Sequence, residues 1–297
     1  MTNPSVVYPP PYEDAELQER RPSCSNLPPV DLDHLQNLGL DMDEIRENED
    51  MQYCLRKMDA MMQRDYKGCI ASEDLGFDID TLVASLARHP GQPYQGPIVL
   101  VSADDLTSFM DNEAKRPFKG DFKPRILRLG DKRRSAKDLI RERWDFIIVT
   151  RSFLRSSFRR HYLHHNKTSG ARPKSESALY SKTWREEGLS IRALVIDEAQ
   201  VFANKMSTLK DEAIKELDCD TVILSMTAPL PNNIKDLFGL VFLLPGNPFH
   251  NYKTFKQAFQ VGAELPRGLA DDYQQLMKRF LNDVVLSPPN IPLGFQE

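Results

Sequence analysis

The sequence predicts an α/β protein built on a doubly wound, mainly parallel sheet. Short runs of valine, isoleucine and leucine recur along the middle of the chain, and such runs are typical of parallel strands buried on both faces. Segments with a helical spacing of apolar residues lie between these runs. With 297 residues, 40% of them hydrophobic, the chain is long enough to bury a sizeable core.

Five apolar runs are the predicted strands. They are Ile98–Ser102, Arg125–Leu129, Phe146–Thr150, Ala193–Asp197 and Thr221–Ser225. Helices are predicted where apolar side chains recur with the period of a helix. These segments are 51–62, 81–88, 209–217, 232–244, 252–259 and 271–285.

The two ends of the chain differ from the middle. Residues 1–30 contain seven prolines, which exclude a helix or a central strand, so we expect a disordered leader there. The predicted core domain spans 31–250, with a basic insertion at about 151–175. Residues 251–297 are expected to form a helical extension.

Several classes of protein are excluded by simple patterns. No apolar run approaches the roughly 18 residues that a transmembrane helix requires, so we expect no membrane partner. The first residues have neither the basic nor the apolar segment of a secretory signal. The four cysteines are scattered without a CxxC pair, and we interpret them as reduced thiols in a nuclear or cytoplasmic protein.

The formal net charge of -4 hides a strong asymmetry along the chain. Residues 1–90 hold 18 acidic and 8 basic residues, whereas residues 115–174 hold 19 basic and 5 acidic ones. Clustered lysines and arginines bind phosphates through the release of counterions. The basic block is therefore either a polyanion-binding face or a solvated loop with a nuclear-import signal around Lys132–Arg134.

The strongest candidate site follows the fourth predicted strand. Asp197 and Glu198 come directly after Leu194–Ile196, and the carboxyl end of such a strand opens onto the ligand crevice of an α/β sheet. The first carboxylate can hold Mg²⁺ and the second can orient an attacking water, which is the Walker B arrangement. The alternative is a capped turn in which Asp197 is a helix N-cap.

A second polar cluster follows the next strand. Ser225 and Thr227 stand at the strand end, and Asn232 precedes the helix that is predicted after it. Such a cluster can relay the state of a nucleotide to another surface. It can equally be a plain connection between a strand and a helix.

Together these motifs resemble the N-terminal ATP-binding lobe of the Swi/Snf-type helicase-like ATPases, which are chromatin remodellers and DNA-repair translocases. Asp197–Gln200 resembles box II of the family, and Met226–Asn232 resembles box III. Pro97–Ser102 and Trp144–Thr150 are similar to boxes Ia and Ib. The resemblance covers roughly residues 50–285. It implies a RecA-like P-loop lobe with three α/β/α layers, ATP and Mg²⁺ as cofactors, DNA as a partner and a nuclear location.

The P-loop is where the chain departs most from the family. Gly68–Asp80 matches the first box of the family without a gap, and Gly76 is retained. Ile79 stands in place of the phosphate-binding lysine, Asp80 in place of the Mg²⁺-binding hydroxyl, and Asp78 in place of a glycine. A P-loop holds phosphates with backbone N–H groups and a lysine, so two aspartates there would repel a triphosphate.

The resemblance assigns roles to further residues. Gln200 takes the nucleotide-binding position of the box II histidine, while Thr227 and Asn232 take coupling positions in box III. ATP is hydrolysed between two lobes in this family, and the second lobe supplies an arginine finger. The chain ends at Glu297, soon after a segment that resembles the linker to that lobe, so we expect a protein partner to supply it.

The basic segment after box Ib is the candidate DNA-binding surface that the resemblance implies. The candidate residues are Thr150, Arg151, Arg155, Arg159 and Arg160. No acidic residue occurs between 146 and 175, and the interleaved aromatic residues would suit phosphate contact with stacking. The alternatives are a solvated basic loop inserted at 151–174, or a metal site made of His161, His164 and His165.

We therefore expect a degenerate, pseudoenzyme-like lobe of the chromatin-remodelling or DNA-repair lineage. It would act as a DNA- or protein-binding module without autonomous ATP hydrolysis. One alternative is a residual ATP-hydrolysing fragment completed by a second lobe in trans, with Asp197 and Glu198 as catalytic residues and Asp197 as the Mg²⁺ ligand. The other alternative is a non-functional, truncated gene product.

Overall fold

A seven-stranded parallel sheet forms the centre of the protein, as the sequence predicts. The structure is a computed structural model that describes residues 27, 29–62, 67–71, 79–88, 92–102, 115–130, 134–165, 177–203, 209–227, 233–249, 251–259 and 267–287. The strands are β1 (Gly68–Ala71), β2 (Ile98–Ser102), β3 (Ile126–Arg128), β4 (Phe146–Thr150), β5 (Ala193–Ile196), β6 (Val222–Ser225) and β7 (Val285–Leu286). They pair in the order β3-β4-β2-β5-β6-β1-β7.

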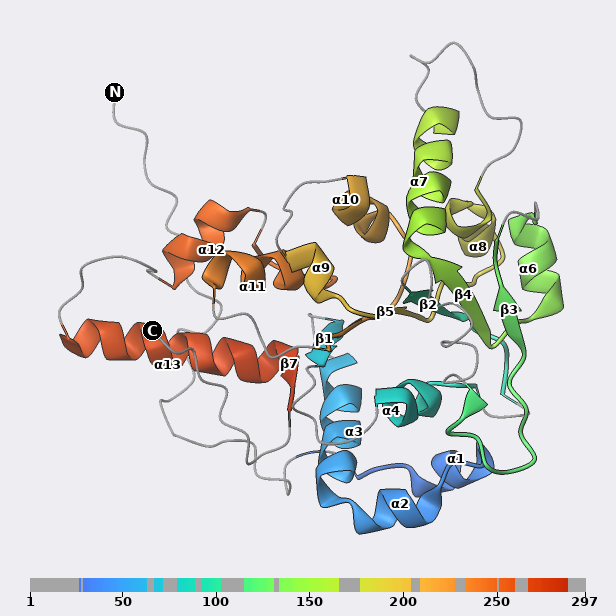
Figure 1. The fold of residues 1–297 in the computed structure, drawn as a ribbon, viewed down its shortest axis with the longest axis horizontal. Helices are drawn as coiled ribbons and strands as arrows, with labels where there is room; N and C mark the ends of the chain where they lie inside the picture. The colour runs from blue at the N-terminus through green and yellow to red at the C-terminus, as the bar shows by residue number, and fades with distance from the viewer. Residues whose placement is uncertain are drawn as a thin grey trace.

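Helices cover both faces of this sheet (Figure 1). On one face lie α1 (Leu32–Asn37), α2 (Met42–Glu47), α3 (Glu49–Met62) and α4 (Ile79–Ser85). On the other lie α6 (Ala136–Glu142), α7 (Arg151–His165), α8 (Thr183–Glu186), α9 (Gln200–Ala203), α10 (Leu209–Lys215), α11 (Ile234–Val241), α12 (Tyr252–Ala258), α13 (Arg267–Val284) and the 3-10 turn Ala178–Tyr180. None of the described helices is long and apolar enough to cross a membrane.

The two cores are filled by alternate residues of the same strands. In β2, Val99 and Val101 pack under α6, α7 and α11, whereas Ile98 and Leu100 pack under α3 and α4. Since successive strand residues point to opposite faces, a strand buried on both sides must be apolar throughout. This requirement explains why the strands can be recognised in the sequence as unbroken apolar runs.

The basic segment after β4 is a helix, which differs from the inserted loop that we expected. Residues 151–165 form α7, and only the part of that segment beyond residue 165 lies outside the described residues. Thr150 Oγ1 accepts a hydrogen bond from the backbone N–H of Phe153 at 3.0 Å, in the manner of an N-cap. Leu154 and Phe158, one turn apart, are both buried against the sheet. The helix therefore forms because one side of it is apolar, although its charged residues dominate the sequence.

The predicted C-terminal extension is part of the lobe. Helix α13 leads into β7, which pairs with β1 and so adds a parallel strand to the sheet. Phe280 of α13 is fully buried among Phe249, Phe255 and Phe259, with ring centroids 5.6, 6.0 and 5.3 Å away respectively. Such tilted and edge-on pairs stabilise a core beyond the area that they bury. The Pro-rich leader falls almost wholly outside the described residues.

We expect Phe280→Ala to destabilise the lobe by about 3–5 kcal/mol, because it leaves a cavity in a closed aromatic cluster. Urea unfolding followed by circular dichroism measures this change. The exposed Tyr162→Ala is the control and should shift the free energy of unfolding by no more than about 0.5 kcal/mol. A Phe280→Ala variant as stable as the wild type would mean that α13 does not pack as described.

The interpretation of the cysteines as reduced thiols yields a second prediction. Burial raises the pKa of Cys54, Cys69 and Cys219 to about 12 in each case, and all three are free. Because the thiolate is the nucleophile, a Cys24→Ser variant should react with iodoacetamide far more slowly when native than in urea at the same pH. Equal rates measured by mass spectrometry in the two states would contradict the burial of these thiols.

Candidate functional site

Several predicted site residues lie at the carboxyl edge of the sheet. Thr150 at the end of β4 is in register with Ser102 at the end of β2. Asp197, the residue after β5, donates its backbone N–H to the carbonyl oxygen of Val101 at 3.0 Å. The three strand ends are therefore level, and the residues that follow them lie at one edge of the sheet.

The turn after β5 presents the two adjacent carboxylates of Asp197 and Glu198. Asp197 Oδ1 accepts the backbone N–H of Glu198 at 2.9 Å. Burial, and next the charge of Glu198, raise the pKa of Asp197 above its usual value, while that N–H group and Arg151 act in the opposite direction. Glu198 has a φ of 49°, in the left-handed region that non-glycine residues rarely adopt. Helix α9 begins only at Gln200, so Asp197 does not stand at its N-cap.

Arg151 lies beside these carboxylates, an arrangement that the sequence analysis did not anticipate. Its Nη2 donates to Glu198 Oε2 at 3.0 Å and to the carbonyl oxygen of Asp197 at 2.9 Å. The side chains are 19% exposed for Arg151 and 32% exposed for Glu198. Arg151 was predicted to contact DNA with the other basic residues of its segment, and the structure directs its guanidinium to the Walker B turn instead of outward. The position of Arg151 is the relevant signal. Arg151 and Glu198 each come one residue after the level strand ends, at Thr150 and Asp197.

The structure brings boxes II and III together. Gln200 Nε2 donates a hydrogen bond to Thr227 Oγ1 at 2.7 Å. The backbone reinforces this contact, because the N–H of Ala199 donates to the carbonyl oxygen of Ser225 at 2.8 Å. Asn232, the other predicted coupling residue, lies outside the described part of the chain. The proximity of Gln200 and Thr227 is what a relay between the two boxes requires.

Of the predicted P-loop, only its last two residues, Ile79 and Asp80, are described. Gly76 and Asp78 fall outside the described residues, and helix α4 begins at Ile79. Asp80 is paired with Arg116, with 3.2 Å between Oδ2 and Nη2. The aspartate that replaces the Mg²⁺-binding hydroxyl is thus in contact with a cation of the same chain.

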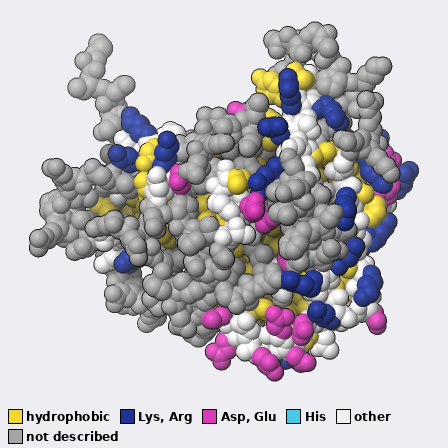
Figure 2. Space-filling model, viewed as in Figure 1, with side chains coloured by type: hydrophobic (Ala, Val, Ile, Leu, Met, Phe, Trp, Pro, Cys, Tyr) yellow, Lys and Arg dark blue, Asp and Glu magenta, His cyan; other side chains and the backbone are white. Residues whose placement is uncertain are grey.

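The carboxyl ends of β3 and β4 border a cavity of about 570 Å³ at the start of α7. Its described lining includes the hydroxyl-bearing residues Thr150, Ser152 and Ser156 and two arginines, Arg128 and Arg155, and no described lining residue is acidic. Further along α7, Arg159 is exposed and Arg160 is half-buried. Figure 2 shows lysine and arginine side chains over the upper right of the molecule, where α7 lies, and acidic side chains at its lower edge, over α1 and α2. On this face, basic side chains predominate around α7 and acidic ones around α1 and α2, while both signs occur elsewhere.

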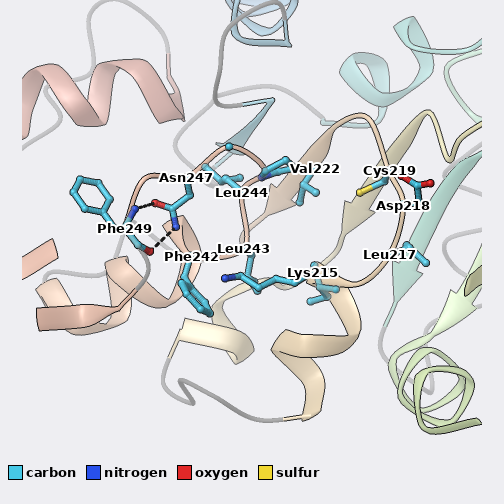
Figure 3. A pocket seen from close by; sticks show the side chains of 13 residues that line it. Lys215, Leu217, Asp218, Cys219, Val222, Phe242, Leu243, Leu244, Asn247 and Phe249 are labelled. Atoms are coloured by element: carbon cyan, nitrogen blue, oxygen red, sulfur yellow. Dashed lines mark hydrogen bonds between the residues drawn. The ribbon is translucent and has the colours of Figure 1, made fainter. Parts of the chain in front are cut away.

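A second cavity, of about 310 Å³, lies at the opposite edge of the sheet (Figure 3). It is bordered by Asp218 and Cys219, which precede β6, and by Leu244 and Asn247, which follow α11. Asn247 Oδ1 accepts the backbone N–H of Phe249 at 2.9 Å. This cavity is remote from the carboxylates, since it lies at the amino end of β6.

The histidine-based metal site finds no support within the described residues. The ring of His161 stacks on that of Tyr180, with centroids 5.4 Å apart. The side chains of His164 and His165 lie outside the description. No group of three or more histidine, cysteine, aspartate or glutamate residues in the described part of the chain is arranged to hold a metal ion.

The comparisons with known proteins agree with the motifs. A sequence model of the SNF2-related domain matches residues 54–288, and the chain belongs to this family. No curated protein sequence matches the chain significantly. The fold is similar to the Sulfolobus solfataricus SWI2/SNF2 ATPase core in complex with dsDNA, at 18% identity and a TM-score of 0.54, over 79% of this chain and 43% of that one. The SWI2/SNF2 ATPase core domain of the same organism gives 18% identity and a TM-score of 0.52, over 81% of this chain and 43% of that one.

The chain thus has the RecA-like fold of an SNF2 ATPase lobe and spans less than half of those two structures. ATPases of this family use ATP and Mg²⁺. The described residues do not fit that pair of ligands in the way the family requires. Glu198 Oε2 is held by Arg151 and Asp80 by Arg116, and isoleucine at position 79 supplies no positive charge for a phosphate.

Proposed function

We propose that this protein is a degenerate Swi/Snf-type lobe that binds double-stranded DNA through α7 and does not hydrolyse ATP by itself. The observation that carries the proposal is the cavity at the start of α7, which two arginines and three hydroxyl-bearing residues border. Backbone N–H groups at a helix N-terminus attract anions, and arginine binds phosphate with a planar fork of donors. A DNA phosphate is an anion that suits this combination.

The exposed side of α7 extends the same surface away from the sheet. The exposed residues are Ser152, Arg155, Ser156, Arg159 and Tyr162. Arg155 and Arg159 are one turn apart, about 6 Å along the axis, so both can face one strand of a duplex. Serine and tyrosine hydroxyls commonly contact phosphates as well. Since these are contacts to the backbone, the proposal is for binding without sequence specificity.

The structural neighbour supports the DNA part of the proposal, because that ATPase core is in complex with double-stranded DNA. The absence of autonomous hydrolysis follows from the residues at the carboxylates and from the isoleucine at position 79. A role in chromatin remodelling or DNA repair, a nuclear location and a protein partner that brings a second lobe belong to the same proposal. They rest on the family and, for the location, on the basic run 132–137.

Duplex binding should weaken steeply as salt rises, because each neutralised phosphate releases a counterion. Arg155→Ala and Arg159→Ala should each lower the slope of log K against log [salt] by about 0.9. Fluorescence anisotropy of a labelled duplex at several salt concentrations measures both quantities.

The matched control for these variants is Arg46→Ala, which removes one exposed positive charge from α2, on the other side of the molecule. It should leave the slope unchanged. If all three variants behave alike, or if wild-type binding does not respond to salt, α7 is not the DNA-binding surface.

ATP turnover by the isolated chain should not exceed that of its Asp197→Ala variant, with or without duplex DNA. The reason is that no P-loop lysine is present to bind a triphosphate and that one oxygen of Glu198 already accepts from Arg151. A coupled-enzyme assay measures the turnover. Hydrolysis that disappears in Asp197→Ala would contradict this part of the proposal and favour a residual ATPase.

A further inference from the structure

Two arginines of this chain form ion pairs with acidic side chains in the two predicted nucleotide-binding motifs, the P-loop and the turn after β5. Arg116 lies 3.2 Å from Asp80, and Arg151 lies 3.0 Å from Glu198. We propose that Arg151 is a built-in counter-cation of the Asp197–Glu198 pair and takes the place there of a divalent ion. Arg151 is then a positioning residue, which acts by holding the carboxylates and not by contacting a substrate.

The backbone fixes the point from which the Arg151 side chain starts. Arg151 is the first residue of α7, directly after the strand end at Thr150, and Thr150 caps the helix. Leu154 and Phe158 anchor the helix in the core. In the sheet order β4-β2-β5 one strand separates β4 from β5, so Arg151 and Glu198 start about 10 Å apart. The Arg151 side chain is long enough to span most of the distance between the two backbones, and the Glu198 side chain spans the rest.

The guanidinium engages the turn at two points. One nitrogen of Arg151 donates to the Glu198 carboxylate and to the Asp197 carbonyl oxygen, so the side chain is held against both residues. The left-handed φ of Glu198 belongs to the same arrangement, because a non-glycine residue keeps this conformation only where its surroundings hold it. The contact is partly shielded from water, which makes it stronger than an ion pair on an open surface.

A hard divalent cation would need carboxylate oxygens of this same turn. Mg²⁺ and Mn²⁺ bind carboxylate oxygens, and one of the two Glu198 oxygens already accepts from Arg151. A divalent ion would have to displace the guanidinium or bind a few ångströms from a fixed positive charge. Arg151 thus occupies one carboxylate oxygen of the pair, on Glu198, and its charge repels an ion from Asp197, the predicted Mg²⁺ ligand.

This inference rests partly on the proposed function, because each of them requires that Asp197 and Glu198 do not bind a complex of Mg²⁺ and nucleotide. It does not involve DNA. An experiment with Mn²⁺ alone therefore separates the two, because its failure leaves DNA binding by α7 intact.

The test is the binding of Mn²⁺ to the full chain, measured from the electron paramagnetic resonance signal of the free ion. The wild type should show no saturable site at the carboxylates. Arg151→Met, which roughly keeps the length of the side chain and removes its charge, should gain a saturable Mn²⁺ site, at least about tenfold tighter than any residual binding to the wild type. Asp197→Asn in the Arg151→Met background should abolish the gain. The melting temperature of Arg151→Met should rise with Mn²⁺, while that of the wild type stays constant.

Arg185→Met is the matched control, because Arg185 also forms a 3.0 Å ion pair, with Asp218, but at an exposed position with one carboxylate. It should gain no Mn²⁺ site. Arg151→Lys keeps a cation and should bind Mn²⁺ more weakly than Arg151→Met. Equal Mn²⁺ affinity in the wild type and Arg151→Met, or equal gain in Arg151→Lys and Arg151→Met, would overturn the proposal. If Arg151→Met does not fold, wild-type binding that Asp197→Asn removes would overturn it equally.

Discussion

Parallel pairing of β4, β2 and β5 places three strand ends level at one edge of the sheet, and the chemistry of the lobe depends on this register. Thr150 and Ser102 are partners, and Asp197 bonds to the strand that carries Ser102. The residues that come next, Arg151 and Glu198, are thereby set in one row. A shift of a strand by one residue would exchange its two faces and break the row together with both cores.

The two-sided core maintains this register. Because alternate residues of each strand fill opposite cores, no strand can slide without exposing apolar side chains to water or burying polar ones. The C-terminal part contributes to the same effect, since β7 pairs with β1, the strand that leads into the P-loop. The strand behind the nucleotide end thus has a neighbour on each side, β6 and β7.

The sheet could be predicted from sequence because strands buried on both faces are apolar throughout. The five predicted strands all appear, with β3 trimmed to Ile126–Arg128. Other elements escaped the prediction. Strand β1, Gly68–Ala71, was not among the predicted strands, and helices α1, α2, α6 and α8 were not predicted either. Strand β7 is only two residues long and has no pattern of its own. Helix α7 was taken for a loop because its many arginines obscure the apolar side formed by Leu154 and Phe158.

Part of the candidate site could be predicted from the sequence, and part could not. Asp197, Glu198, Gln200 and Thr227 could be placed near one another because they lie in the segments that follow two predicted strands, β5 and β6, which are neighbours in the sheet. Their roles came from the resemblance and stay predictions. The partner of Glu198 was not found, since pairing across an intervening strand depends on the order β4-β2-β5, which sequence spacing does not reveal. A charge count places Arg151 with the basic residues that face outward, whereas the register directs it to the carboxylates.

The central claim is that the nucleotide end of this lobe is neutralised from within and does not take up Mg-ATP. Isothermal titration calorimetry of the wild-type chain with Mg-ATP measures this most directly. The account predicts no saturable heat up to about 1 mM nucleotide. Saturable binding with a dissociation constant in the micromolar range, lost in Asp197→Ala, would contradict it.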